Sequence, residues 1–212
     1  RLDTVVADLD GPTQIAWHPD GRLLVAVLGP GGEGSETGQI LAVDLDEPEA
    51  VTVLVDGLDT PTGVAATEDR LWIMERTQLV ATDLDGGPTE VVRADLPSNG
   101  RSNGSLTVVG DGRLVYDTSG RLRDGEVVPD SGVVWALDPS DPGDVDTSIV
   151  VGMKHGYAAT PLDEDLLITE IGDGRFDGQP PADEVLRVPL PADAGTPPVD
   201  GGWPRCVGDR RP

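Results

Sequence analysis

The sequence repeats one pattern four times along its length. Each copy has a small or polar start, an apolar stretch, a turn and a second apolar stretch, and the copies begin at Pro12, Pro61, Ser102 and Lys154. These starts lie 49, 41 and 52 residues apart. A period of this size is typical of small sheets stacked side by side, because one such sheet cannot bury both of its faces alone. The repeat therefore limits the chain to stacked-repeat architectures.

The apolar stretches of each repeat are predicted to be strands. Apolar residues alternate in Leu23–Val27 and Leu71–Met74, and no stretch has the 3.6-residue period of an amphipathic helix. Asp20-Gly21 and Asp111-Gly112 are hairpin-turn signals between such stretches. A third apolar stretch closes every repeat, with the sequences GQILAVDL, TQLVATDL, GVVWALDP and DEVLRVPL. The pattern predicts an all-β chain: a β-propeller of four-stranded antiparallel blades, about four in this chain, forming a single domain over residues 1–212.

The number of blades leaves two architectures open. Four repeats can close as a four-bladed ring, or they can form part of a larger ring. The stretch 190–202 is rich in proline and glycine and is predicted to be a loop, so it supplies no closing strand. We expect a larger ring that is completed by residues or by a chain not present in this sequence.

Composition limits the kinds of partner that the protein is expected to bind and the compartment in which it is expected to work. The net charge of −24 argues against nucleic acid, which is bound through clustered Lys and Arg. The sequence contains no run of about 18 apolar residues, so no membrane span is predicted. The acidic side chains are scattered, which is typical of a solvated surface in a salty or extracellular setting, or of a surface that binds Ca²⁺. We expect an extracellular or periplasmic protein whose signal peptide has been removed.

An ordered series of motifs in the second half of the chain resembles a known family. The series comprises Gly152–Tyr157, Leu166–Glu170, Gly172, Asp183-Glu184 and Gly202-Trp203-Pro204. It resembles the soluble PQQ-dependent glucose and sorbosone dehydrogenases over about residues 94–206. The resemblance implies a six-bladed propeller that transfers hydride from an aldose to a quinone held by Ca²⁺.

The resemblance also assigns site residues, with departures from the family pattern. The position of the family's catalytic His is matched by Arg101, and an arginine stays protonated and is no ordinary general base. The quinone-binding Arg is matched by Lys154 and the neighbouring Asn by His155. The Asp that orients the family's His falls near Gly120-Arg121, where no carboxylate is found. We expect His155 and Arg101 at the catalytic positions.

The implied cofactors are PQQ and Ca²⁺. The resemblance and the local charge assign Lys154, Arg121 and Trp203 to cofactor binding. They assign the metal to the glycine-rich turn with Gly172 and Asp173 and to Asp183, because Ca²⁺ prefers hard oxygen ligands. Alternatives remain for both sets: a histidine packed at a strand end for His155, and an acidic loop that holds no metal.

Cys206 is the only cysteine, so it has no partner within this chain. In the resembling family the Gly-Trp-Pro motif is often followed by a Cys that pairs with a later one. We therefore expect Cys206 to pair with a cysteine on a second chain or on a segment absent from this sequence.

Three further residue groups admit plain interpretations. His18 is predicted to be a surface turn residue, and Trp17, Trp72 and Trp135 are predicted to pack in the core or between blades. Asp117 and Ser119 lack the Gly-x-Ser-x-Gly elbow of a nucleophile.

Two other classes of function stay open beside the divergent sugar dehydrogenase. One is a non-catalytic module that binds a sugar or an anionic ligand. The other is a metal-dependent lactonase-type hydrolase, which needs carboxylates and an amide around a cation. Its candidate residues are Asn99, Asn103, Glu75 and Glu170.

Overall fold

The structure, a computed structural model, describes most of the first half of the chain and separate segments of the second half. The described residues are 4–96, 104–110, 112–118, 122–123, 126–128, 131–140, 147–153, 156–170, 184–190 and 199–200. Every described element is a strand, which confirms the all-β prediction. The described part of the chain contains no helix with the length and apolarity needed to cross a bilayer.

The first two blades are four-stranded antiparallel sheets whose strands follow chain order. The first blade consists of β1 (Pro12–Trp17), β2 (Leu23–Val27), β3 (Gly38–Val43) and β4 (Val51–Leu58). The second consists of β5 (Gly63–Ala66), β6 (Arg70–Met74), β7 (Leu79–Asp83) and β8 (Glu90–Arg93). In both blades the first three strands coincide with the three apolar stretches of the repeat.

The third and fourth blades follow the same plan with small differences. The third contains β9 (Leu106–Val108), β10 (Leu114–Thr118), β13 (Gly132–Leu137) and β14 (Thr147–Met153), with β18 (Val199–Asp200) parallel to β14 at its edge. The described strands of the fourth are β15 (Gly156–Leu162), β16 (Asp165–Glu170) and β17 (Glu184–Pro189). A separate hairpin pairs β11 (Leu122–Arg123) with β12 (Glu126–Val127). The stretch 190–202, predicted to be a loop, thus contributes one short strand.

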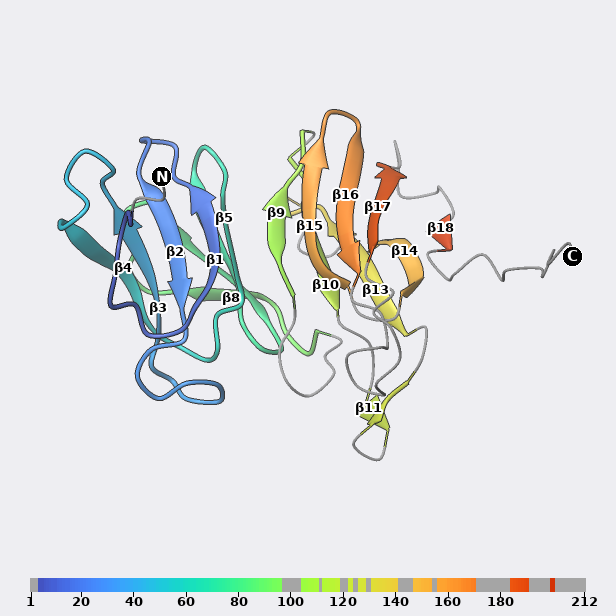
Figure 1. The fold of residues 1–212 in the computed structure, drawn as a ribbon, viewed down its shortest axis with the longest axis horizontal. Coiled ribbons are helices and arrows are strands. Elements are labelled where there is room, and N and C mark those ends of the chain that lie inside the picture. Colours follow the sequence, from blue (N-terminus) through green and yellow to red (C-terminus); the bar gives the residue numbers. More distant parts are fainter. Residues whose placement is uncertain are drawn as a thin grey trace, which may run out of the picture.

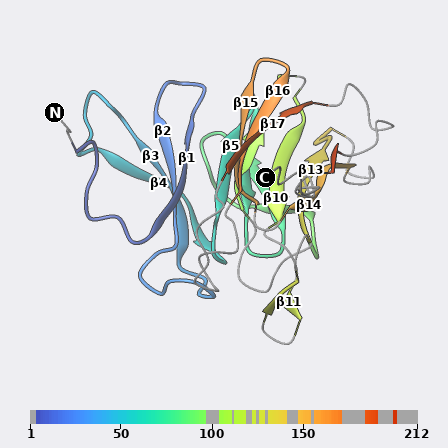
Figure 2. The same cartoon turned by 45° about the vertical axis from the view of Figure 1, so that its right-hand side comes forward.

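The four blades lie in chain order and together form a four-blade propeller arrangement (Figures 1 and 2). The first strand of each blade is its innermost strand. β1 contacts β5, β5 contacts β9, and β9 contacts β15. The blade ends that carry these inner strands therefore face a common axial region.

Apolar clusters fill the three interfaces between neighbouring blades. Because side chains alternate along a strand, β6 sends Leu71 and Ile73 toward the first blade and Trp72 and Met74 toward the third. Between the third and fourth blades, Val115 and Val134 pack with Leu166 and Ile168. Each interface buries its side chains almost completely, which is how repeats that are unstable alone stabilise one another.

The two terminal blades leave apolar side chains exposed on their outer faces. On β1, Ile15 and Trp17 are 62% and 63% exposed, and on β17 Val185 is 64% exposed. Among the described residues Trp17 therefore packs neither in the core nor between blades, whereas Trp72 and Trp135 do pack between the second and third blades. Trp17 lies on the face of β1 opposite Ala16, and only the Ala16 face packs against the second blade.

Candidate functional site

The predicted site residues lie outside the described residues. These are His155 and Arg101 at the catalytic positions, Lys154, Arg121 and Trp203 at the cofactor, and Gly172, Asp173 and Asp183 at the metal. Cys206, Asn99 and Asn103 also lie outside. Their assignment remains a prediction. The described residues nearest in sequence, such as Gly104, Thr118 and Gly156, belong to the third and fourth blades.

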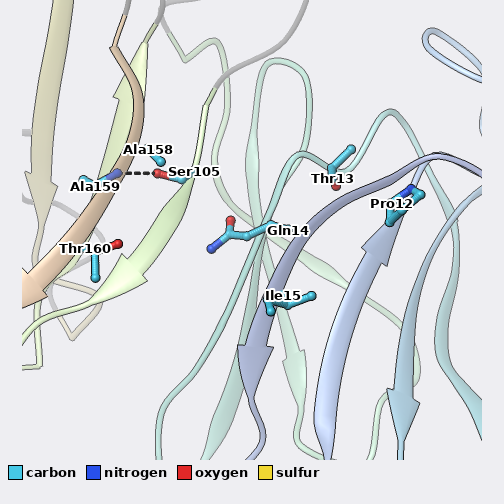
Figure 3. Close-up of a pocket in the computed structure, with 8 residues that line it drawn as sticks. All are labelled: Pro12, Thr13, Gln14, Ile15, Ser105, Ala158, Ala159 and Thr160. Atoms are coloured by element: carbon cyan, nitrogen blue, oxygen red, sulfur yellow. Dashed lines mark hydrogen bonds between the residues drawn. The ribbon is translucent and has the colours of Figure 1, made fainter. Parts of the chain in front are cut away.

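A groove lies between the innermost strands of the first and fourth blades. Its volume is about 420 Å³, a size typical of small-molecule sites. We call it the axial groove and define it by its lining residues: Pro12, Thr13, Gln14, Ile15, Ser105, Ala158, Ala159 and Thr160. Figure 3 shows β1 on one side of it and the strands that carry Ser105 and Ala159 on the other.

The Gln14 side chain crosses from the first blade to the third. Its Nε2 donates to the Leu106 carbonyl at 2.7 Å, and its Oε1 accepts from the Leu106 N–H at 3.0 Å. The same Oε1 accepts from the Val64 N–H of the second blade at 3.3 Å. Figure 3 shows the side chain pointing from β1 toward the Ser105 segment. One amide therefore fixes the relative positions of three inner strands.

Gly63 makes this crossing possible. A Cβ on Gly63 would lie 2.7 Å from Leu106 Cβ, 2.8 Å from Leu106 N and 3.0 Å from Gln14 Oε1. The inner strands of the second and third blades approach too closely at this point for any side chain. A glycine is therefore required here by the close approach of two strands.

The Ser105 hydroxyl connects the third blade to the fourth, and a buried carboxylate of the third blade holds Ser105 in place. Its N–H and its Oγ both donate to Asp117 Oδ1, at 2.9 Å and 3.0 Å. Its Oγ accepts from the Ala159 N–H at 2.9 Å, the contact drawn in Figure 3. Ser105 lines the axial groove and Asp117 lies behind it, fully buried on β10. The groove thus has an ionisable group one hydrogen bond away from its wall.

The Asp117 carboxyl has an unusual ionisation. Burial raises its pKa to about 6, although the hydrogen bonds from Ser105 act in the opposite direction. Its Oδ2 has no hydrogen-bond partner among the described residues. A Cβ on Gly104 would lie 2.0 Å from this oxygen, so the carboxylate packs flush against the Gly104 backbone. The charged form of Asp117 is therefore costly and is held by Oδ1 alone.

The described lining of the groove is uncharged. The lining combines the hydroxyl groups of Thr13, Ser105 and Thr160 and the amide of Gln14 with the apolar surfaces of Pro12, Ile15 and two alanines. The Thr13 hydroxyl donates to the carbonyls of Ala26 and Pro61. Such a mixture suits a neutral ligand with both hydroxyl groups and C–H faces. The described lining offers no cation for an anionic quinone such as PQQ. Among the described residues, no group of three His, Cys, Asp or Glu side chains could hold a metal ion.

Two other candidates from the sequence have structural roles. His18 is 5% exposed, so the prediction of a surface turn residue is wrong. Its Nε2 donates to the Leu84 carbonyl of the second blade at 3.2 Å, which ties the first hairpin to the neighbouring blade. Glu75, a candidate for lactonase chemistry, accepts from Asp59 N with Oε1 at 2.7 Å and from the Gln78 amide with Oε2. Both of its carboxylate oxygens are engaged within the second blade.

Sequence reasoning missed Gln14, Ser105 and Asp117 as site residues. For Asp117 a signal existed, because it interrupts the apolar strand LVYDT at a position where the second blade has Met74 in LWIM. For Gln14 the sequence offered none, because its partner Leu106 is 92 residues away.

No protein-family model and no curated protein matches the chain. Solved structures do match. The PQQ-bound aldose sugar dehydrogenase from Streptomyces coelicolor is 19% identical, with a TM-score of 0.70 over 99% of this chain and 67% of that protein. A glucose-dehydrogenase-type oxidoreductase from Thermus thermophilus is 19% identical, with a TM-score of 0.66 over 100% of this chain and 69% of that protein.

A gluconolactonase from Xanthomonas campestris is 20% identical, with a TM-score of 0.60 over 89% of this chain. The chain covers 61% of that gluconolactonase, so it spans about two thirds of the length of these proteins or less. At these identities the likeness shows a shared fold, and the chain has the β-propeller fold found in sugar dehydrogenases and in a gluconolactonase.

Proposed function

We propose that this chain belongs to a divergent propeller of the PQQ-dependent sugar dehydrogenase type and binds an aldose-like sugar in the axial groove. The observation that carries the proposal is the lining of the groove, where uncharged hydroxyl and amide groups are combined with apolar surfaces on the inner strands. The fold likeness to an aldose sugar dehydrogenase over 99% of the chain supports the same ligand class. If the protein is an active dehydrogenase, hydride would pass from the sugar to a quinone.

The cofactor site is the part of this proposal that rests on sequence alone. Lys154, Arg121 and Trp203 would hold the anionic quinone, and Gly172, Asp173 and Asp183 would hold Ca²⁺. His155 would accept the sugar proton, with Arg101 opposite. The described groove supplies no charge to this site, so the cationic positions must provide the whole complement to a quinone.

The proposal includes a secreted or periplasmic location and a ring completed by further residues or by a second chain. Exposed apolar side chains on the outer faces of both terminal blades, Ile15 and Trp17 on one and Val185 on the other, support the completed ring. In the complete ring these faces would be buried, as the three described interfaces are. Cys206 would pair with a cysteine of the completing segment.

The test is calorimetric titration of PQQ into the protein with Ca²⁺, and again with a chelator. Calcium-dependent binding followed by sugar-dependent reduction of an artificial electron acceptor supports the dehydrogenase. Lys154→Ala should then weaken PQQ binding, whereas Arg70→Ala, whose guanidinium pairs with Glu90 on the outermost strand β8 of the second blade, should not. PQQ that fails to bind in both conditions contradicts the dehydrogenase.

A lactonase-type hydrolase is the second candidate, favoured by the fold likeness to a gluconolactonase. Its signature would be hydrolysis of a sugar lactone that a chelator abolishes, without any requirement for a quinone. Glu75 already accepts one hydrogen bond on each carboxylate oxygen, so a role in this chemistry would use the remaining lone pairs of these oxygens. A non-catalytic sugar-binding module would instead show thermal stabilisation by a sugar with no turnover of sugars or lactones.

A further inference from the structure

Ser105 has hydrogen-bonding capacity left for a ligand. A serine hydroxyl has one donor and two acceptor lone pairs. The donor is directed to Asp117 Oδ1 and one lone pair accepts from the Ala159 N–H. One lone pair therefore remains on the hydroxyl of Ser105, a residue that lines the axial groove. With its hydrogen held by Asp117, the Ser105 hydroxyl can act toward a ligand only as an acceptor.

We propose that Ser105 accepts a hydrogen bond from a hydroxyl group of a neutral sugar in the axial groove, and that the charge on Asp117 makes Ser105 the acceptor. This inference rests on the proposed function, because it specifies how the groove recognises its ligand. The ionised carboxylate draws the Ser105 hydrogen toward Oδ1 and polarises the hydroxyl, which strengthens Oγ as an acceptor. A neutral carboxyl binds that hydrogen more weakly and frees the hydroxyl to rotate.

Among the described residues in this region only Asp117 titrates, so its ionisation determines whether the Ser105 hydroxyl is held as an acceptor. Facing Asp117 are Ser105 from the segment before β9 and Val134 of β13, its partner in the sheet register, while Ala159 of β15 contacts it through Ser105. None of these side chains titrates. The raised pKa is caused by burial and modified only by hydrogen bonds, so no charged side chain of the described residues competes for control of Asp117.

The expected pH dependence follows from that pKa. If the sugar binds the ionised form, the apparent affinity falls by the fraction of protein in which Asp117 is ionised. With a pKa of about 6, roughly one molecule in ten is ionised at pH 5 and nearly all are at pH 8. Binding should therefore tighten about tenfold between pH 5 and pH 8. By linkage, bound sugar should lower the pKa of Asp117.

The experiment uses D-glucose as the probe and the whole chain. Affinity is measured at pH 5 and pH 8 for the wild type, Asp117→Asn and Ser105→Ala, and the carboxyl carbon of Asp117 is titrated by NMR with and without glucose. The wild type should show the tenfold change and a lowered pKa in the presence of glucose. Asp117→Asn should bind with equal affinity at both pH values, and Ser105→Ala should bind about tenfold more weakly at pH 8.

The chain provides a matched control for the pair. Ser140 donates to Asp138 Oδ1 through its N–H at 2.8 Å and through its Oγ at 2.7 Å, the same arrangement on an exposed turn. Ser140→Ala and Asp138→Asn should leave both the affinity and its pH dependence unchanged.

The outcomes separate this inference from the proposed function. Glucose that binds the wild type equally at pH 5 and pH 8, with an unmoved Asp117 titration, overturns the inference and leaves the sugar site standing. Glucose that binds at neither pH overturns both. Changes in affinity or in its pH dependence that Asp138→Asn reproduces would show a general charge effect and would also overturn the inference.

Discussion

The second and third blades both begin with a hairpin of the same geometry, β5–β6 in the second and β9–β10 in the third. The two hairpins differ in the residues at one pair of facing positions. In the second blade Gly63 pairs with Met74, which is fully buried in the apolar cluster between these blades. In the third blade Ser105 and Asp117 take these places. The backbone is unchanged, because Thr62 N donates to the Met74 carbonyl at 2.8 Å and Gly104 N to the Asp117 carbonyl at 2.9 Å.

The difference teaches that the fold does not need the polar pair. An apolar residue satisfies the same position in the second blade, whereas the third blade accepts a buried carboxylate at a cost in stability. The rise of the Asp117 pKa from 3.8 to about 6 corresponds to roughly 3 kcal/mol at neutral pH. A residue that is present despite such a cost is a reasonable candidate for a function, here the recognition of a ligand in the axial groove.

The largest expected effect comes from moving the carboxylate into the second blade. Met74→Asp should lower the free energy of unfolding by about 4 kcal/mol or more at pH 7, because Gly63 has no hydroxyl to donate to the new carboxylate. Urea denaturation measures the loss. Met74→Leu, which keeps the site apolar, should cost less than about 1.5 kcal/mol. A Met74→Asp variant as stable as Met74→Leu would show that the two blades do not differ in this respect.

The pH dependence of stability should identify Asp117 next. Its pKa is higher in the folded chain than the value of 3.8 expected when unfolded, so the stability that it contributes at low pH is lost as pH rises through about 6. The Asp117→Asn variant has no ionisable group at this position, so its stability does not fall in this way as pH rises. Between pH 4 and pH 7, the stability difference should shift in favour of the variant by about 2.4 kcal/mol. Parallel stability curves for both proteins would contradict the raised pKa.

A side chain at Gly63 should disturb the crossing of the inner strands. Gly63→Ala places a Cβ within 2.8 Å of the Leu106 backbone nitrogen and should cost about 2 to 3 kcal/mol in thermal or urea unfolding. Gly110→Ala is the control, because a Cβ there meets no atom within 4 Å. Equal losses for the two variants would mean that the close approach of the strands is not the cause.

Removal of the Gln14 amide should have the smallest of these effects. Gln14→Ala leaves the N–H and carbonyl of Leu106 and the N–H of Val64 without their partner, at a cost of about 2 kcal/mol. Gln39→Ala removes one exposed contact to Asp56 and should cost less than about 0.5 kcal/mol. If Gln14→Ala matched Gln39→Ala, water would have to satisfy the abandoned groups.

The blades were predictable because their signal is local. The apolar strand patterns and the Asp20-Gly21 turn lie within single hairpins, and the repeat spacing can be counted along the chain. The strands β3, β7, β13 and β17 occur in the four third stretches that the sequence marked. Burial set by neighbouring blades was not predictable in the same way. His18 reads as a turn residue but is covered by the second blade. Trp17 reads as a core residue but lies on the outer face of the first blade, where Val6 and Leu9 pack over β2 and β3 and Trp17 stays exposed.

The axial groove was hidden from the sequence for a related reason. Its residues come from β1, from the segment before β9 and from β15, which are far apart in the chain. No short motif encodes such a meeting. The resemblance to sugar dehydrogenases directed attention to positions such as Arg101 and Lys154, whereas the described geometry centres on Ser105 and Asp117, which no family motif marked.

The reach of Gln14 has a consequence for how such a chain can evolve. Repeat proteins grow and shrink by gain or loss of whole units, and most units contact only their neighbours. Here one side chain of the first unit bonds to the second and to the third. A duplication inserted among these three units would separate Gln14 from Leu106 and leave the Gln14 amide and the Leu106 backbone groups without partners. The first three units should therefore be inherited as one block, and variation in unit number should be confined to positions before the first unit or after the third.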